Sequence, residues 1–280
     1  MERRRIAVSD GTELAVIEAG EGRPLLMLPG WSQTAEGFAA QIEAFAARRR
    51  VIALDHRGHG ASAKPDHGYS VHRLAKDLHD VIAALGLDRP DALGHSMGCS
   101  VIWAHHALFA GEQDLGRLIL VDEAPAPTAQ PDWDERTRLE AGCLMPSAEA
   151  LSGFIAAVRE ARTAETTVEV IRGMFTARMP ADALLRIAAG NLDLPREHAA
   201  TLLWDHATID WRPEISRLRH ETLVIGAEAS IFSARSQEWI AEQIPCARCV
   251  IFGADEGGSH FMFHENPGRF NDEVLAFLDG

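Results

Sequence analysis

The sequence predicts an α/β fold with an eight-stranded, mostly parallel sheet, helices on both faces and a helical insertion. Three observations support this prediction. Short β-type runs alternate with helical segments, several of these runs are continuously apolar, and one long block has no strand signal. Alternating strands and helices are typical of parallel sheets, and continuously apolar strands are typical of sheets that helices cover on both faces. The 280 residues, 46% of them hydrophobic, suffice for a large core.

Eight segments are expected to form the sheet. The first two should be an antiparallel lead-in, whereas several of the later ones are apolar throughout and should be parallel. In chain order, the expected strands are Arg5 to Val8, Leu14 to Glu18, Pro24 to Leu28, Arg50 to Leu54, Asp91 to Leu93, Arg117 to Val121, Thr222 to Ile225 and Arg248 to Phe252.

The segment 125–205 is predicted to be a helical cap on a core domain formed by residues 1–124 and 206–280. Prolines mark its start, and strand character returns only at Leu223. Because the strands before and after it belong to one sheet, the segment is an insertion rather than a terminal domain. Its clearest helical patterns are Ala148 to Arg162, Thr166 to Arg178 and Ala181 to Asn191.

The strongest chemical signal is the pentapeptide Gly94 to Gly98, which has the pattern G-x-S-x-G. It follows a predicted strand and precedes a predicted helix over Cys99 to Phe109, which is the context of a strained strand-to-helix turn. Small residues let such a turn clear its neighbours, and the N-terminus of the helix stabilises negative charge that forms beside the serine. Ser96 is therefore predicted to be a nucleophile.

A serine nucleophile needs a base, and His260 is the candidate. It follows the last predicted strand and precedes the last helix, expected around Asn266 to Leu278. Glycines before it allow the loop to fold back over the sheet edge. His264 could form a metal pair with it, but no third ligand and no glutamate in the usual spacing supports a metal site.

The base in turn needs a carboxylate that fixes its tautomer, and two positions qualify. Asp122 ends the strand expected over Arg117 to Val121, and Glu228 follows the strand expected over Thr222 to Ile225. Either strand end could face His260 in a doubly wound sheet, so the residues alone leave both open.

Two backbone N–H groups are expected to stabilise the oxyanion. Met97 directly follows the nucleophile, and Trp31 lies in the loop after the third expected strand, at the mouth of the sheet. The pocket is expected to be apolar. Its expected residues are Trp31, His95, Met145, Phe154, Met174, Phe175 and Trp204.

Composition disfavours several other classes of protein. The net charge of −14 disfavours binding to nucleic acids and to anionic membranes. No apolar run approaches the roughly 20 residues of a membrane span, and the N-terminus has no leader pattern, so a cytoplasmic protein is expected. Cys246 and Cys249 form a single C-x-x-C without a second ligand pair, which supports neither a zinc site nor redox chemistry.

The chain resembles the α/β-hydrolase superfamily over essentially its whole length. Four motifs occur in the order found in that family. They are Leu28-Pro29-Gly30-Trp31, the D-x-R-G-x-G-x-S segment Asp55 to Ser62, the pentapeptide Gly94 to Gly98, and Gly258-Ser259-His260. The resemblance implies the α/β-hydrolase fold, no metal or organic cofactor, and a structural role for the second motif.

One departure from the family pattern bears on the acid. The superfamily usually carries it in a G-x-x-D after the strand that matches Thr222 to Ile225, but the segment Gly226 to Ala229 has alanine at that position. Certain lactonases and dehalogenases instead carry the acid after the preceding strand. That place corresponds to Asp122, so the resemblance favours Asp122 over Glu228.

The resemblance implies a serine hydrolase that cleaves a carboxylic ester or lactone of a small, apolar or aromatic molecule through an acyl-enzyme. Haloalkane dehalogenases and epoxide hydrolases use an aspartate nucleophile, so Ser96 argues against both. A carbon–carbon bond hydrolase, a cofactor-free dioxygenase and a non-catalytic receptor are the alternatives. The dioxygenases usually have a histidine where this chain has Gln33. The expected partner is a small-molecule substrate, and a homodimer is left open.

Overall fold

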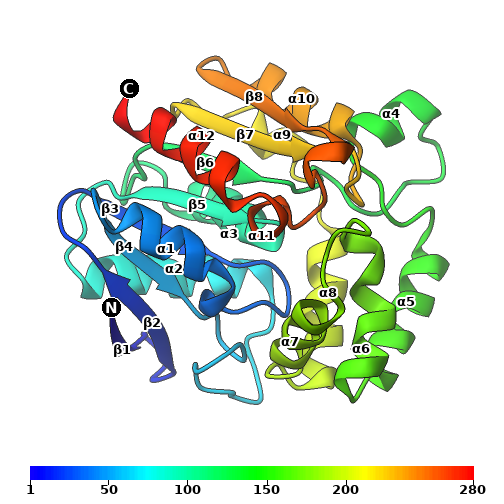
Figure 1. The fold of residues 1–280 in the computed structure, drawn as a ribbon, viewed down its shortest axis with the longest axis horizontal. Helices are drawn as coiled ribbons and strands as arrows, with labels where there is room; N and C mark the ends of the chain where they lie inside the picture. Colours follow the sequence, from blue (N-terminus) through cyan, green and yellow to red (C-terminus); the bar gives the residue numbers. More distant parts are fainter.

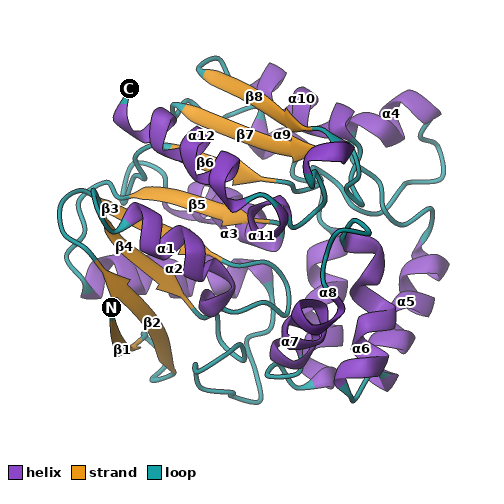
Figure 2. Ribbon diagram, in the orientation of Figure 1, coloured by secondary structure: helices purple, strands orange, loops and turns teal.

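The structure, a computed structural model, describes residues 1–280 and contains one eight-stranded sheet (Figures 1 and 2). The strand order is β1-β2-β4-β3-β5-β6-β7-β8, in which β2 pairs antiparallel with β1 and β4 and all other neighbours are parallel. The predicted sheet and its antiparallel lead-in are confirmed. The strands are β1 (Glu2–Ala7), β2 (Glu13–Ala19), β3 (Pro24–Leu28), β4 (Arg50–Leu54), β5 (Asp91–His95), β6 (Leu118–Val121), β7 (Thr222–Ala227) and β8 (Ala247–Phe252).

β1 begins at Glu2, three residues before the expected start, because it is a charged edge strand. Its backbone pairs with β2 from Glu2 opposite Glu18 onward, while nearly all of its side chains are exposed. Exposed charges protect such an edge from pairing with other chains. Hydrophobic periodicity cannot detect a strand of this kind.

Helices cover both faces of the sheet (Figure 1). β3 shows how the sequence achieves this, because consecutive side chains of a strand point to opposite faces. Leu25 and Met27 join the apolar cluster that contains α1 and α12, whereas Leu26 and Leu28 join the cluster that contains α2 and α3. The helices of the two faces are α1 (Ala39–Phe45), α2 (Val71–Ala84), α3 (Met97–Phe109), α10 (Ala234–Gln243), α11 (Met262–Glu265) and α12 (Pro267–Asp279), with 3-10 turns at Ala35–Phe38 and Ala254–Glu256.

The segment between β6 and β7 is helical and lies over the carboxyl ends of the parallel strands (Figure 1). Within it α5 packs against α8 and α6 against α7, and α4 packs against α10 of the sheet. Their buried side chains belong to the same two apolar clusters as the sheet, so the boundaries of a separate cap at 125 and 205 stay a prediction. The helices are α4 (Glu135–Glu140), α5 (Ala148–Glu160), α6 (Ala164–Ile171), α7 (Ala181–Asn191), α8 (Arg196–Thr208) and α9 (Arg212–Ile215).

One expected helix is shorter than predicted. The helical pattern over Thr166 to Arg178 gives α6, which begins at Ala164 and ends at Ile171, followed by a 3-10 turn over Arg172–Met174. Thr163 caps the N-terminus, since its hydroxyl accepts the N–H of Thr166 at 3.3 Å. Glycine inside the turn at position 173 disfavours continuation of the helix.

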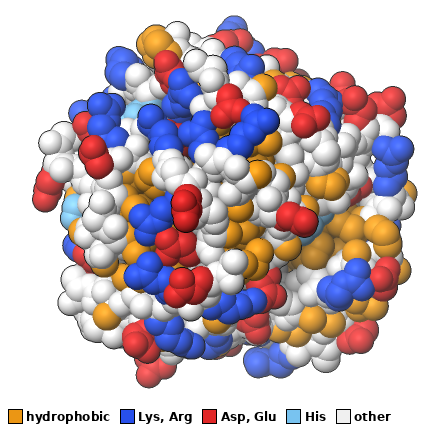
Figure 3. All heavy atoms as spheres, turned by 60° about the vertical axis from the view of Figure 1, so that its left-hand side comes forward, with side chains coloured by type: hydrophobic (Ala, Val, Ile, Leu, Met, Phe, Trp, Pro, Cys, Tyr) orange, Lys and Arg blue, Asp and Glu red, His pale blue; other side chains and the backbone are white.

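Basic and acidic side chains are interspersed on the face of the protein drawn in Figure 3. Figure 3 shows the face on the left of Figure 1, where basic and acidic side chains alternate, so the net negative charge of the chain is not gathered there. None of the helices combines the length and the apolar composition that crossing a membrane requires.

Candidate active site

Ser96 lies at the turn between β5, which ends at His95, and α3, which begins at Met97. Its backbone is strained, with φ 52° and ψ −128°. The flanking glycines make the turn feasible. A Cβ on Gly98 would lie 2.2 Å from the carbonyl oxygen of Leu28, and one on Gly94 would lie 2.6 Å from the nitrogen of Cys99. The sequence therefore holds the Ser96 hydroxyl at the positive end of α3.

His260 and Asp122 form a buried pair at the same edge of the sheet. Asp122 directly follows β6, and His260 lies in the loop between β8 and α11. Nδ1 of His260 is 2.6 Å from Oδ2 of Asp122, and the Ser230 hydroxyl also donates to this oxygen. The carboxylate is fully buried and the imidazole is 3% exposed. Such a bond sets the tautomer in which Nδ1 carries the proton and Nε2 is free to accept one.

Glu228, the second candidate for the acid, does not face His260. Its side chain is exposed, and its Oε2 accepts the N–H of Ala254 at 3.0 Å. This hydrogen bond connects the end of β7 with the turn after β8, so Glu228 stabilises a loop. The interpretation of Glu228 as a partner of the base is therefore wrong.

Burial dominates the electrostatics of the pair. It lowers the pKa of His260 to about 3, because the charged ring would lose its hydration. Burial also raises the pKa of Asp122 above its usual value, whereas the hydrogen bonds that Oδ2 receives from Ser230 and from Nδ1 of His260 favour the ionised carboxylate. The imidazole is consequently neutral at pH 7, the form that a general base requires.

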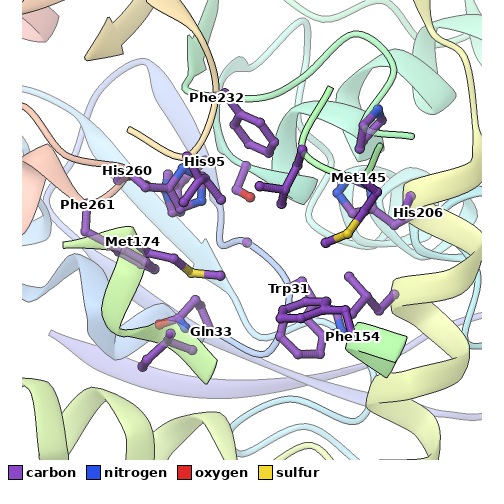
Figure 4. A pocket seen from close by; sticks show the side chains of 18 of the residues that line it. Trp31, Gln33, His95, Met145, Phe154, Met174, His206, Phe232, His260 and Phe261 are labelled. Atoms are coloured by element: carbon purple, nitrogen blue, oxygen red, sulfur yellow. The ribbon is translucent and has the colours of Figure 1, made fainter. Parts of the chain in front are cut away.

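Ser96 and His260 line one pocket, and Figure 4 shows the ring of His260 at its wall beside His95. The hydrogen bond of the His260 ring goes to Asp122 rather than to Ser96. His95 braces the histidine loop from below. Its Nε2 lies 2.9 Å from the carbonyl oxygen of His260, so the ring donates to that carbonyl.

Two backbone N–H groups are available beside Ser96. Met97 is the first residue of α3, so its N–H lies outside the hydrogen-bond ladder of the helix. The N–H of Trp31 has no acceptor in the protein. The loop that carries Trp31 is fixed on both sides, because its indole donates to the carbonyl of Ala199 at 2.8 Å and the next residue, Ser32, donates its N–H to His59 at 3.1 Å.

The segment Asp55 to Ser62 braces this loop and does not enter the pocket. Asp55 accepts the N–H groups of Ala35 at 2.7 Å and of Ala61 at 2.9 Å, and the Ser62 hydroxyl donates to the carbonyl of Asp55 at 2.6 Å. One carboxylate thus joins the segment after β3, which also carries Trp31, to the loop after β4.

The pocket lies between the sheet edge and the helical segment. Most of its residues are hydrophobic, and they come from the loops after the strands, from α5, α6, α7 and α8, and from the loops that join these helices. Its lining is Gly30, Trp31, Gln33, His95, Ser96, Pro127, Leu144, Met145, Leu151, Phe154, Ile171, Met174, Asn191, Leu203, His206, Ala207, Ile231, Phe232, His260 and Phe261.

Two predicted pocket residues do not line it. Trp204 is 43% exposed, because the neighbouring Leu203 occupies the inner face of α8 and successive residues of a helix point about 100° apart. Phe175 is buried behind the wall, where its ring stacks on Phe261 with centroids 4.5 Å apart. The other five expected residues line the pocket.

Sequence reasoning missed a second buried pair of a histidine and a carboxyl group, His206 and Glu123. His206 of α8 lines the pocket, and its Nε2 is 3.4 Å from Oε2 of Glu123, the residue after Asp122. The spacing from Leu203 to His206 places both on one side of the helix, which is the only signal the sequence carries for this histidine. No group of three or more His, Cys, Asp or Glu side chains is arranged to hold a metal ion.

Comparison with known proteins agrees with this architecture. A family model described as alpha/beta hydrolase fold matches residues 23–267. Epoxide hydrolase A from Mycobacterium tuberculosis is 27% identical over 315 residues, covering 99% of this chain and 97% of that protein. The esterase EaEST from Exiguobacterium antarcticum is structurally similar with a TM-score of 0.88 at 22% identity, covering 100% of both chains. The enol-lactonase from Burkholderia xenovorans has a TM-score of 0.83 at 22% identity, covering 99% of this chain and 100% of that one.

Proposed function

The chain belongs to the α/β-hydrolase fold family, and from this premise we propose that it is a serine hydrolase that cleaves a carboxylic ester or lactone through an acyl-enzyme. The observation that carries the proposal is the buried contact of 2.6 Å between His260 and Asp122 in the pocket that Ser96 also lines. A neutral imidazole, oriented by a carboxylate and sharing a pocket with a serine on a strained turn, supports activation of the serine hydroxyl.

In the first half of the reaction, the Ser96 oxygen attacks the carbonyl carbon and Nε2 of His260 takes the hydroxyl proton. The carbonyl oxygen becomes an oxyanion, which the N–H groups of Trp31 and Met97 would hold. Asp122 stabilises the imidazolium that forms. When the tetrahedral intermediate collapses, the bond to the leaving oxygen breaks and His260 protonates that oxygen, so an alcohol departs and an ester of Ser96 remains.

In the second half, water attacks the acyl-enzyme and His260 accepts one of its protons. Collapse of the second intermediate returns the proton to Ser96 and releases the carboxylic acid. The net change is addition of one water across the ester bond. Every proton moves through His260, so the reaction needs no further catalytic group.

A small, apolar or aromatic substrate is supported by the lining of the pocket. Trp31, Met145 and Phe154 supply large apolar surfaces, and burying such surface is worth about 25 cal/mol per Å². The likeness to epoxide hydrolase A raises epoxide opening as another hydrolysis. That reaction uses an aspartate nucleophile in this superfamily, and Ser96 stands at the nucleophile position here, so a carbonyl substrate is favoured.

Two further candidate reactions are a carbon–carbon bond hydrolysis and a cofactor-free oxygenation of a heteroaromatic ring. The oxygenase is disfavoured by Gln33, which lines the pocket where the related oxygenases carry a histidine. Oxygen consumption with a heteroaromatic substrate and little ester turnover would identify that reaction instead.

The test is labelling with a fluorophosphonate, followed by mass spectrometry of the peptides and turnover of p-nitrophenyl esters. We expect the label on Ser96, and loss of both label and turnover in Ser96→Ala. Ser100→Ala is the matched control, because Ser100 is a buried serine one turn further along α3 that does not line the pocket. Labelling of another residue, or ester turnover that persists in Ser96→Ala, would refute the proposal.

A further inference from the structure

The proposed reaction does not use a buried polar pair, Glu123 and His206, of which His206 lines the pocket. His206 forms part of the wall contributed by α8, and Figure 4 shows it across the pocket from His260. Both side chains are almost wholly buried, Glu123 at 1% and His206 at 5% exposure. Nε2 of His206 lies 3.4 Å from Oε2 of Glu123. A buried polar pair in an apolar wall is costly unless its hydrogen-bonding groups are used.

The hydrogen bonds of this pair are incomplete within the protein. Oε1 of Glu123 accepts the N–H of Ala124 at 2.6 Å, and Gln237 donates to the backbone carbonyl of Glu123 at 2.9 Å. Oε2 has only Nε2 of His206 beside it, at 3.4 Å, and makes no hydrogen bond in this structure. Nδ1 of His206 is likewise buried and has no hydrogen-bond partner. Two polar atoms of the pair are therefore left unsatisfied by the fold.

The charge of the pair determines what Nδ1 can do. Burial and the neighbouring Asp122 raise the pKa of Glu123 well above its usual value, and burial lowers the pKa of His206 to about 4. If both groups are neutral and the carboxyl proton is on Oε2, that proton lies on the side of Nε2, so the ring carries its own proton on Nδ1. If the two form an ion pair, the imidazolium also has a proton on Nδ1.

Only one state would leave Nδ1 without a proton. In it Glu123 is ionised and His206 is neutral with its proton on Nε2, which leaves a net negative charge buried next to Asp122. No lysine or arginine contacts Glu123, so this state would have no compensation for its desolvation. Nδ1 is thus a hydrogen-bond donor without an acceptor.

We propose that His206 is a substrate-binding residue whose Nδ1–H donates to a second carbonyl oxygen of the substrate, at the wall opposite His260, and that Glu123 is the positioning residue that holds the ring. The inference rests on the proposed function and adds to it a substrate class, esters with an additional uncharged acceptor oxygen. An anionic group is disfavoured there because it would be buried near Asp122, with no lysine or arginine beside the pair to compensate its charge.

The test compares esters that differ by one carbonyl group. One pair, p-nitrophenyl 4-oxopentanoate and pentanoate, places the oxygen in the acyl part, and a second pair, 4-oxopentyl and pentyl acetate, places it in the alcohol part. We expect the enzyme to prefer the oxo ester in one pair by kcat/KM. His206→Phe should lower that preference about tenfold, the size of a typical buried hydrogen bond, because phenylalanine fills the space without a donor.

Three variants separate binding from a structural effect. Glu123→Gln should keep the preference, since its amide can donate to Nε2 as the protonated carboxyl does, whereas Glu123→Leu should lose it. His198→Phe is the matched control on the same helix, because His198 stacks on Tyr69 and does not line the pocket. The urea unfolding midpoint of each variant shows whether its fold is intact, and His198→Phe should in addition label Ser96 at the rate of the natural chain.

The inference is overturned if the enzyme prefers neither oxo ester, or if His206→Phe leaves the preference unchanged while Ser96 is still labelled. Failure of the proposed function is distinct, since then the natural chain is neither labelled nor active on any ester. A binding measurement decides the inference in that case. Ser96→Ala should bind methyl 4-oxopentanoate more tightly than methyl pentanoate by calorimetry, and equal binding before and after His206→Phe would overturn it.

Discussion

Asp122 and Glu123 are neighbours in the chain, yet their carboxyl groups contact different histidines of one pocket. Asp122 meets Nδ1 of His260 at 2.6 Å, and Glu123 meets Nε2 of His206 at 3.4 Å. The backbone of Asp122 makes this divergence possible, because its φ of 49° turns the chain sharply as β6 ends. Two adjacent acids thereby reach His260 and a histidine of the helical segment.

The assignment of the acid predicts a large difference between two matched variants. Asp122→Asn keeps the size of the side chain but removes the charge that holds the tautomer of His260, so kcat should fall by about 10⁴-fold. Glu228→Gln should leave kcat within about twofold, because the exposed Glu228 only accepts one backbone N–H and the amide oxygen of glutamine can do the same. Steady-state kinetics with one p-nitrophenyl ester checks both. Equal, mild losses in the two variants would mean that neither residue serves.

Ser230 should set the pH at which the site becomes active. Burial raises the pKa of Asp122 to about 8, and the Ser230 hydroxyl that donates to Oδ2 lowers it. The carboxylate must be ionised to stabilise the imidazolium, so activity is lost as the pH falls through the apparent pKa of the pair. Ser230→Ala removes a donor to the ionised form, raises that pKa further, and should move the acidic limb of kcat/KM to higher pH.

The measurement is the pH profile of kcat/KM from about pH 5 to about pH 10, a range that includes the expected acidic limb. Ser216→Ala on the exposed end of α9 is the control and should superimpose on the natural chain. A shift of the Ser230→Ala limb to lower pH would contradict the assignment of Asp122.

The lining of the pocket predicts which aromatic residue controls the length of the acyl chain. Phe154 lines the pocket, whereas Trp204, on α8, is 43% exposed outside it. Phe154→Ala should enlarge the pocket and shift the preferred p-nitrophenyl ester to a longer chain, changing the ratio of kcat/KM between hexanoate and acetate by about tenfold. Trp204→Ala should leave that ratio unchanged. The reverse pattern would show that α8 turns its other side to the substrate.

The sequence was sufficient for the positions that strand ends determine. Ser96 and Asp122 each follow a parallel strand, and such strands bring their carboxyl ends to one edge, so a pocket position for Ser96 and a meeting of His260 with an acid at one of two strand ends, Asp122 or Glu228, could be anticipated. The preference for Asp122 over Glu228 required the family resemblance as well. Neither acid is distinguished by its local pattern, and only the three-dimensional turn at Asp122 separates them.

Positions on the helical segment were harder to predict, because their orientation depends on packing rather than on the sheet. α8 mixes polar and apolar residues around its axis, so its sequence does not reveal which side faces the pocket. Trp204 was expected inside on its size alone, and Leu203 and His206 occupy the wall instead. The pairing of His206 with Glu123 depends on that same rotation of α8.

Replacement of glycine by alanine should have opposite effects on stability at two positions, Gly98 beside the turn that carries Ser96 and Gly153 within α5. A Cβ on Gly98 would lie 2.2 Å from the backbone oxygen of Leu28, which cannot move without disturbing β3, so Gly98→Ala should lower the free energy of unfolding by about 3 kcal/mol and abolish labelling of Ser96. Gly153 lies within α5 and a Cβ there would meet nothing within 4 Å. Gly153→Ala should therefore stabilise the protein by about 0.5–1 kcal/mol, because alanine loses less backbone entropy in a helix. Urea unfolding of both variants checks the prediction, and a Gly98→Ala protein that is as stable as the natural chain would show that the turn has more room than this structure allows.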